Sequence, residues 1–444
     1  MSRTALPALF LGLFSAAAAL PGHAGIFPYP TRIETLDNGL QVILVPMSSG
    51  GLVSYWSIVR TGARDEVEPG RTGFAHFFEH MMFRGTEKYP ADVYNAITTR
   101  IGADTNAFTS NDLTAYHLSI AGEDLETVID IESDRFQRLD YPEQMFKTEA
   151  GAIYGEFRKN RTNPLFVLLE ALYDEAFERH TYGHTAMGYE EDIRRMPQLF
   201  DYSRSFFDRY YRPDNVVLLV VGDLEIEPTL DEIRRDYGAW EPGYRPPEVP
   251  VEPPQNGERR IDVAYHGNSL PIVWIAYKAP AFDPADVTQT AARLLSELAF
   301  GETSDIYRKL VLEDRVVELV ATEFGVRRDP GLLSVYARVK DPENVDSVIA
   351  EIDRTVELFR SQPPDAQRLA DLKSRLKYDF LMGLDTPAHV ARSLARIIAV
   401  TGGVEAVETL YETYDRVTAE DVQRAAQEIL LRRQRTVGVL RGES

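Results

Sequence analysis

The chain has 444 residues, no cysteine, eight histidines, and 48 basic against 69 acidic side chains, which give a formal net charge of −21. The lack of cysteine excludes a disulfide framework, a thiol nucleophile and an iron–sulfur site, and the acidic balance argues against nucleic-acid binding, which needs a basic face. A hydrophobic content of 44% at this length predicts a folded chain with two or more domains.

Residues 1–24 have the pattern of a secretory signal peptide. Arg3 is followed by an uncharged, mostly apolar run that ends at Leu20, and small residues stand at Gly22 and Ala24. A basic start, an apolar core and a small-x-small site are typical of a leader that is removed. We therefore predict cleavage after Ala24 and a periplasmic or secreted mature protein. The alternative is a retained membrane anchor, for which the apolar run is short.

Strand-like and helix-like patterns are interspersed along the rest of the chain. Apolar, β-branched runs bounded by Gly or Pro predict strands at 41–46, 52–59 and 216–221. Apolar residues at helical spacing, with charged outer faces, predict helices at 125–139 and 364–381. Because the elements lack the regular spacing of βαβ units, we predict an α+β sandwich in which a sheet is backed by helices.

One predicted helix is apolar on nearly every side, with Thr72 as its expected N-cap and Gly85 as its end. Such a helix should be buried, yet it carries His76, Glu79 and His80, and buried ionisable groups are costly unless they are paired or bind a metal. Residues four apart lie one above the other on a helix, so His76 and His80 can present two imidazoles to one ion. Glu79 lies on an adjoining part of that face, and HxxEH is the inverted form of the HExxH zinc motif. The alternative is a pair of histidines hydrogen-bonded within a core.

A catalytic zinc site needs a third protein ligand, and no further histidine is convincingly placed, so we expect a carboxylate. The helix predicted at 144–161 offers Glu149 and Glu156, which are two turns apart and share one face. The alternative is two solvated glutamates on a surface helix. His180 and His184 are also four apart, but the Tyr-Gly turn chemistry between them predicts a loop rather than a second metal pair.

A proline-rich segment at 241–257 divides the chain. Such a density of proline cannot sustain a helix or a central strand and predicts a stiff extended linker. We therefore predict an N-terminal domain at 25–240, which carries the candidate metal residues, and a C-terminal domain at 258–444 without a metal site.

The two domains are predicted to be diverged copies of one unit. Several stretches of the first half match the second half at a constant offset of 220 residues. The aligned pairs include Tyr116 with Tyr336, Leu125 with Val345, Val217 with Val437 and Gly222 with Gly442. Agreement in the same order along both halves predicts a two-fold internal repeat.

The spacing of these motifs resembles that of the inverzincin metallopeptidases, the family of pitrilysin, insulin-degrading enzyme and the mitochondrial processing peptidase. In that family HxxEH is followed by a third ligand some 76 residues beyond the second histidine, with another glutamate seven residues before it. Here Glu156 lies 76 residues after His80, and Glu149 lies seven residues before Glu156. The resemblance continues at 105–116, 181–193 and 210–223. It covers most of the first half closely and the second half loosely, and it implies two homologous α/β sandwich domains with mostly antiparallel sheets, as in the short two-domain members.

The resemblance also implies roles for the candidate metal residues. His76, His80 and Glu156 resemble the ligands of one Zn²⁺ per chain. Glu79 resembles the base that takes a proton from the zinc-bound water and passes it to the leaving amine. Glu149 resembles the carboxylate that orients a ligand histidine. The implied activity is that of a zinc endopeptidase.

Four further residues resemble parts of the family's substrate site. Asn106, Ala107 and Phe108 resemble the edge strand on which a peptide docks by β-addition. Phe83 resembles a wall of the pocket for the residue that follows the scissile bond.

The chain departs from the family at one place. Active members use an arginine and a tyrosine, seven apart, in the second domain, and the matching positions here hold Val311 and Glu318. Neither residue can donate a hydrogen bond to the substrate carbonyl as that pair does. We infer that the chain carries the metal while a homologous subunit supplies the Arg/Tyr pair in a heterodimer. The alternatives are a homodimeric peptidase and a non-catalytic scaffold or chaperone-like subunit that retains zinc.

Overall fold

The first half of the protein forms a six-stranded sheet. The computed structural model describes residues 25–443, so the predicted signal peptide lies outside the described residues. The strand order is β1-β2-β6-β3-β5-β4, with β2 parallel to β6 and all other neighbours antiparallel. These strands are β1 (Arg32–Thr35), β2 (Gln41–Pro46), β3 (Leu52–Val59), β4 (Asp104–Thr109), β5 (Thr114–Ala121) and β6 (Val216–Gly222). The three strands predicted here are confirmed.

The second half forms a five-stranded sheet in the order β7-β11-β8-β10-β9. Only the pair β7 and β11 is parallel. The strands are β7 (Arg259–His266), β8 (Ile272–Ala279), β9 (Val317–Phe324), β10 (Gly331–Val339) and β11 (Arg435–Glu443). Both sheets are mostly antiparallel, so the predicted α+β fold is confirmed.

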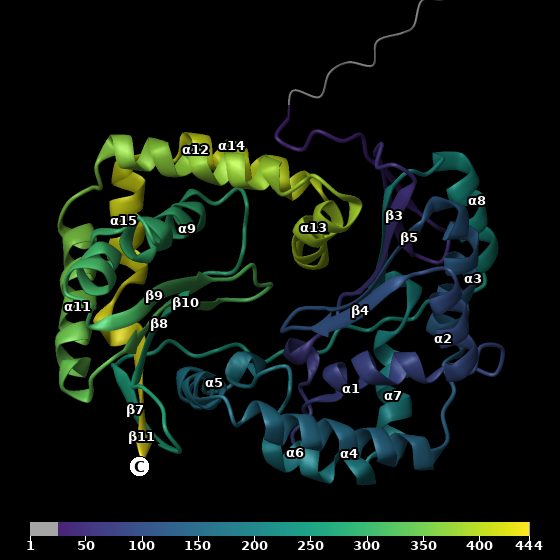
Figure 1. Ribbon diagram of the computed structural model, residues 1–444, viewed down its shortest axis with the longest axis horizontal. Helices are drawn as coiled ribbons and strands as arrows, with labels where there is room; N and C mark the ends of the chain where they lie inside the picture. The colour runs from purple at the N-terminus through teal and green to yellow at the C-terminus, as the bar shows by residue number, and fades with distance from the viewer. Residues whose placement is uncertain (1–24, 444) are drawn as a thin grey trace, which may run out of the picture.

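Helices of the first half cover one face of the first sheet (Figure 1). They are α1 (Phe74–Met81), α2 (Ala91–Arg100), α3 (Leu125–Arg138), α4 (Glu143–Asn160), α6 (Glu190–Arg195), α7 (Phe200–Tyr210) and α8 (Ile226–Tyr237). The apolar faces of these helices, except α2, form one core with the sheet, in which Phe77 and Phe78 of α1 are completely buried. The helices predicted at 125–139 and 144–161 are α3 and α4.

Helices of the second half cover one face of the second sheet in the same way. They are α9 (Val287–Phe300), α10 (Asp305–Tyr307), α11 (Val345–Ser361), α12 (Ala366–Met382), α14 (Glu405–Arg416) and α15 (Ala419–Ile429). The helix predicted at 364–381 is α12.

The opposite faces of the two sheets are covered by an exchange of helices. Helix α5 (Pro164–Ala176) belongs to the first half but packs on the second sheet, where Leu168 and Leu172 meet Trp274. Helix α13 (Pro387–Thr401) belongs to the second half but packs on the first sheet. Each half therefore completes the hydrophobic core of the other, which fixes the two halves together.

The predicted internal repeat is present in the topology, because β2-β6-β3-β5-β4 of the first half recurs as β7-β11-β8-β10-β9. The register of the strands, however, differs by one residue from the prediction. Trp56 of β3 lies opposite His117, whereas Trp274 of β8 lies opposite Tyr336. The structural equivalent of Tyr336 is therefore His117, at an offset of 219, and not Tyr116.

This one-residue error has a physical consequence, because a slip of one residue moves a strand side chain to the other face. Tyr116 points into the core beneath α1, while Tyr336 stacks near Trp274 on the face covered by α5. The alignment of Val217 with Val437 is wrong for the same reason, since the two valines belong to cores on opposite faces. The helices keep the offset of 220, because α3 and α11 begin at the aligned residues.

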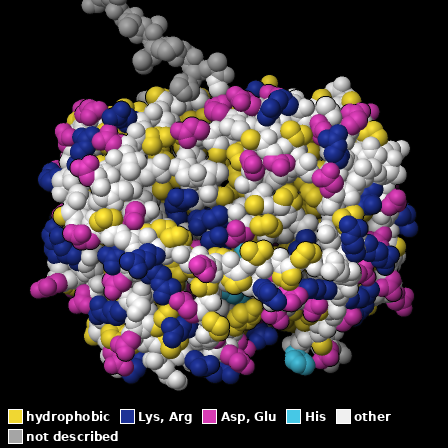
Figure 2. All heavy atoms as spheres, turned by 180° about the vertical axis from the view of Figure 1, so that it is seen from behind, with side chains coloured by type: hydrophobic (Ala, Val, Ile, Leu, Met, Phe, Trp, Pro, Cys, Tyr) yellow, Lys and Arg dark blue, Asp and Glu magenta, His cyan; other side chains and the backbone are white. Residues whose placement is uncertain are grey.

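The segment predicted as a linker, 241–257, contains no helix or strand in the described chain and runs between the two sheets. None of the helices within residues 25–443 has the length and apolar character needed to cross a membrane. Seen from behind, acidic and basic side chains are interspersed over the surface, so on this face the net negative charge does not form a single acidic patch (Figure 2).

Candidate metal centre

Helix α1, which carries the HxxEH motif, is capped by a glutamate from the preceding loop. Both carboxylate oxygens of Glu66 accept backbone hydrogen bonds, from Gly73 N at 2.8 Å and from Ala75 N at 2.7 Å. Burial raises the pKa of Glu66 to about 8. The expectation that Thr72 caps this helix was wrong, because its hydroxyl instead donates to Asp192. The positive φ of 89° at the cap position explains why a glycine, Gly73, stands there.

The predicted end of this helical segment is correct. Helix α1 ends at Met81, and a 3₁₀ turn, Met82–Arg84, continues to Gly85. Six of the eight residues of α1 are buried, among them His76, as the apolar pattern predicted. Helix α1 packs on α4 and on the strands β4 and β5, and these contacts bring the remaining candidate residues to it.

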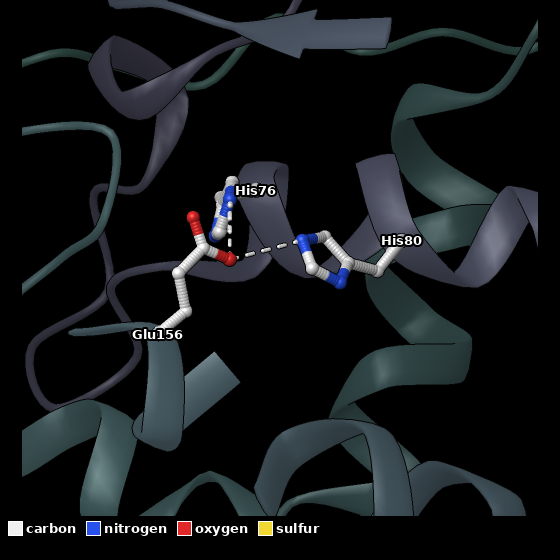
Figure 3. Close-up of side chains that lie close together, drawn as sticks. All are labelled: His76, His80 and Glu156. Atoms are coloured by element: carbon white, nitrogen blue, oxygen red, sulfur yellow. Dashed lines mark ion pairs between the residues drawn. The ribbon is translucent and has the colours of Figure 1, made fainter. Parts of the chain in front are cut away.

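His76, His80 and Glu156 converge on one point (Figure 3). The Oε2 atom of Glu156 lies 3.8 Å from Nε2 of His76 and 3.3 Å from Nε2 of His80. Each side chain can direct one ligand atom to a common ion, with all three atoms within 4.8 Å of one another. Within residues 25–443 this is the one such group of three. Two helices hold it, α1 for the histidines and α4 for the glutamate.

The chemistry of these side chains fits a zinc ion. His76 is 7% exposed, and burial, together with the nearby His80, lowers its pKa to about 3. The imidazole is therefore neutral at ordinary pH, which is the form that binds a metal. Two imidazoles and one carboxylate, with a fourth direction left open, are the ligand set of a catalytic zinc site.

Glu149 contacts the ring nitrogen of His80 that faces away from Glu156. Its Oε1 atom lies 2.9 Å from Nδ1 of His80, and its other oxygen forms an ion pair with Arg84. Burial opposes the charge of Glu149, but the hydrogen bond to His80 and the charge of Arg84 hold its pKa below the ordinary value. A carboxylate on the far nitrogen of a ligand histidine fixes the orientation of the ring and raises its basicity. Arg84 thereby keeps Glu149 ionised, which is the form that accepts a hydrogen bond from the imidazole of His80.

Glu79 lies on the same helix and reaches the end of strand β4. Its Oε2 atom accepts a hydrogen bond of 2.6 Å from the hydroxyl of Thr109. Burial raises the pKa of Glu79 above its ordinary value, although the bond from Thr109 opposes the shift. A glutamate with a raised pKa is better matched to proton transfer near neutral pH than an exposed one.

Strand β4 is the edge of the first sheet, so among the described residues it pairs with a strand on one side only. It contains Asn106, Ala107 and Phe108, the residues predicted to receive an extended peptide. The strand ends at Thr109, which contacts Glu79. A peptide added to this edge would therefore run toward the candidate base.

Phe83 lies on the 3₁₀ turn that follows α1 and is half-buried. Its ring packs near Tyr94 and Tyr116, with the guanidinium of Arg135 5.0 Å from its centroid. This environment fixes the ring, and its proposed place in a substrate pocket stays a prediction.

The remaining candidate positions lie away from the centre. Val311 packs against the second core, and Glu318 is exposed on β9 in an ion pair with Arg338. Neither offers the hydrogen bonds of an arginine or a tyrosine to a carbonyl. His180 and His184 flank a short 3₁₀ turn, as the loop prediction required.

Three residues of this centre were not found from the sequence: Glu66, Arg84 and Thr109. Each acts by a hydrogen bond or an ion pair to a residue on another turn or element. The one sequence feature that indicates a role for Arg84 is its spacing of four residues from His80, on the turn that continues α1. Nothing in a single sequence marks Thr109 or Glu66.

Two models of one protein family match the chain in succession. Residues 42–190 match the model described as Insulinase (Peptidase family M16), and residues 200–376 match the one described as Peptidase M16 inactive domain. The five residues of the centre that were predicted from the sequence, from His76 to Glu156, lie in the first match.

Similar proteins are known over nearly the full length. The zinc protease PqqE of Helicobacter pylori is 26% identical over 420 residues, which cover 93% of this chain and 91% of that protein. The mitochondrial-processing peptidase subunit beta of Dictyostelium discoideum is 24% identical over 429 residues, covering 94% and 90%. The crystal structure of a protease from Helicobacter pylori superposes with a TM-score of 0.86 at 25% identity and covers 93% of this chain and 99% of that one.

Proposed function

Because the chain belongs to peptidase family M16, we propose that it is a zinc-dependent endopeptidase that cleaves peptides or unfolded segments. We further propose that it acts as the metal-bearing subunit of a heterodimer. The single observation that carries the first proposal is the convergence of His76, His80 and Glu156 beside Glu79. The neutral His76 and the oriented His80 give this group the properties of a zinc ligand set.

Five residues of the chain would take part in the proposed reaction. His76, His80 and Glu156 would hold the zinc ion, which supplies polarisation of the scissile carbonyl and a lower pKa for water. Glu79 would accept a proton from the attacking water and later deliver it to the leaving amine. Thr109, by donating to Oε2 of Glu79, would hold the carboxylate in place for this proton transfer.

The proposal of a heterodimer is supported by the residues at two positions of the second half, Val311 and Glu318. Val311 is apolar and Glu318 is anionic, so neither can stabilise a developing oxyanion, which needs donors. A homologous subunit with an arginine and a tyrosine at these positions would complete the site. The similarity to a relative named as the beta subunit of a processing peptidase supports this arrangement.

We also propose that the protein works in the periplasm or outside the cell. The support is the composition of residues 1–24, with a basic start, an apolar run and a small-x-small site.

The test is the variant Glu79→Gln, which keeps the size of the side chain and removes its basicity. Together with a homologous subunit that carries the Arg/Tyr pair, the wild-type chain should cleave a peptide mixture. The variant should be slower by at least about a hundredfold while its zinc content, measured by elemental analysis, stays the same.

The outcomes separate the alternatives. Cleavage at full rate by the purified chain alone would contradict the heterodimer and favour a self-sufficient or homodimeric peptidase. Stoichiometric zinc without cleavage, even with the second subunit present, would favour a non-catalytic scaffold. Retained cleavage by Glu79→Gln would remove Glu79 from the role of base.

A further inference from the structure

The start of the described chain is held by a carboxylate from the other half of the protein. Glu408 on α14 accepts two successive backbone hydrogen bonds, from Ile26 N at 2.8 Å and from Phe27 N at 2.7 Å. The two bonds use different oxygens of the same carboxylate. Residues 25–29 thus belong to the first half in sequence but are bound by the second half (Figure 1).

Apolar packing strengthens this contact. The side chains of Ile26 and Phe27 are 8% and 5% exposed, and they join the core that α13 forms on the first sheet. The hydroxyl of Tyr29 donates to the carbonyl of Leu384, just before α13. Residues 25–29 are therefore held between the two halves by both hydrogen bonds and apolar packing.

Gly25, the residue before Ile26, also lies against the carboxylate of Glu408. A Cβ atom at this position would lie 2.4 Å from Oε1 and 2.7 Å from Oε2 of Glu408. A side chain is excluded there unless Glu408 moves, and Glu408 is held by two backbone donors. The amino nitrogen of Gly25 is bonded to the same Cα, so it lies within reach of the carboxylate once the chain before it is free.

We propose that removal of the leader between Ala24 and Gly25 creates a third ligand for Glu408, the α-ammonium group of Gly25, and thereby locks the two halves together. A leader peptidase adds water across the Ala24–Gly25 peptide bond. The new carboxylate leaves with Ala24, and the nitrogen of Gly25 becomes an amine that is mostly protonated at neutral pH. A carboxylate has about four acceptor positions, so Glu408 can receive the ammonium in addition to its two backbone bonds.

The charge on the nitrogen of Gly25 differs between the precursor and the mature chain. Before cleavage the nitrogen of Gly25 is an uncharged amide, and the contact with Glu408 rests on neutral donors alone. After cleavage one partner carries a full positive charge, and charge-assisted hydrogen bonds are stronger than neutral ones. Processing would therefore strengthen this contact between the halves in the exported protein. This inference does not depend on zinc or on the peptidase activity proposed for the chain.

The experiment first determines the N-terminus and then removes its charge. The intact mass of the exported protein should correspond to a chain that begins at Gly25. A chain prepared with a free Gly25 amine is then compared with the same chain acetylated at that amine. Hydrogen exchange of the amides of Ile26 and Phe27 should be about threefold to tenfold faster after acetylation.

The variant Glu408→Gln shows whether Glu408 receives the charge. In this variant acetylation should no longer change the exchange rate. Glu405→Gln is the matched control, because Glu405 begins the same helix but is exposed, and it should leave the effect of acetylation intact. A mature chain that starts elsewhere, an acetylation without effect, or an effect that persists in Glu408→Gln would each overturn the proposal.

Discussion

The two halves of the protein share one topology but differ in what they bury beneath the sheet. In the first half α1 packs on α4 and on the edge strand β4 with its hairpin partner β5, and it carries His76, Glu79 and His80. In the second half α9 packs on α12 and β9, the equivalent strand, and its buried face is mainly alanine and leucine. The histidines of the second half, His266 and His389, are both exposed.

This difference shows that the architecture does not need the metal residues. The second half forms the same sheet and helix layers without a buried ionisable side chain on α9, whose buried residues are alanine, leucine and phenylalanine with the neutral polar Gln289, Thr290 and Ser296. The first half buries the neutral His76 and partly buries Glu79, whose pKa is raised, and such burial is unfavourable unless a hydrogen bond, an ion pair or a metal compensates it. The predictions below test this separation between fold and chemistry.

The strongest test removes a ligand and leaves the fold. Glu156→Gln should lower the zinc affinity by more than about a hundredfold, since the loss of a ligand should exceed the 10- to 100-fold loss measured for supporting residues. The side chain of Glu156 is 35% exposed, so the thermal stability of the metal-free protein should change little. Metal titration by calorimetry measures the affinity.

The control for this variant is Glu143→Gln, on the same helix. Glu143 pairs with Lys147 on the surface, away from the centre, and its loss should leave the zinc affinity unchanged. If Glu156→Gln binds zinc as tightly as this control, Glu156 is not a ligand, and the convergence of the three side chains has another cause.

The exchange of helices is tested by a cavity in α5. Leu172→Ala should destabilise the second sheet, although Leu172 lies in the first half, because its side chain is completely buried against that sheet. A leucine-to-alanine change in a core costs about 2 to 5 kcal/mol. Hydrogen exchange should accelerate in β8 and β11 more than in β2 and β3. Leu312→Ala, at a leucine that is 58% exposed, should have little effect anywhere.

The sequence predicted the elements of this fold better than their partners. The strands at 41–46 and 52–59 have the predicted bounds, because apolar, β-branched runs are a local signal. The exchange of α5 and α13 was not predicted, since an amphipathic pattern marks the buried face of a helix but not the sheet that covers it. The one-residue error between Tyr116 and Tyr336 has a related origin, because strand register is set by cross-strand pairing.

The sequence predicted the three side chains that converge, His76, His80 and Glu156, but not all the residues that contact them or their helix. His76 and His80 share a helix face, and Glu149 and Glu156 share another, so helical spacing alone pairs them. Thr109 and Glu66 contact α1 from separate elements. Their hydroxyl and carboxylate are common surface groups, and only the packing of α1 against β4 and the preceding loop gives them a role.

The buried histidine predicts a pH dependence for the first half. The pKa of His76 is lowered to about 3 by burial, against about 6.5 in an unfolded chain. Below pH 6.5 the unfolded metal-free chain therefore binds a proton that the folded chain does not. Its stability should fall as the pH decreases from about 6.5 toward 3, by up to about 1.4 kcal/mol per pH unit from this group.

His76→Leu removes the titrating group and isolates the effect. The variant should lose that part of the pH dependence and be more stable than the wild-type protein at pH 5, as measured by urea unfolding without metal. His266→Leu removes a histidine that is 90% exposed and shows the effect of losing an imidazole in general. Equal pH profiles for His76→Leu and the wild-type protein would mean that His76 is solvated.

The smallest expected effect concerns Arg84, which touches the metal centre only through Glu149. Removing its charge by Arg84→Met leaves the buried carboxylate of Glu149 with His80 alone, so the pKa of Glu149 should rise and its hold on His80 should weaken. Because the side chain of Arg84 is 45% exposed, water replaces part of the interaction, and the zinc affinity should fall by only about threefold to tenfold. Arg84→Lys keeps the charge and should restore most of the affinity. An unchanged affinity in Arg84→Met would show that Glu149 orients His80 without the help of Arg84. The ion pair between Arg84 and Glu149 would then have no effect on the metal centre.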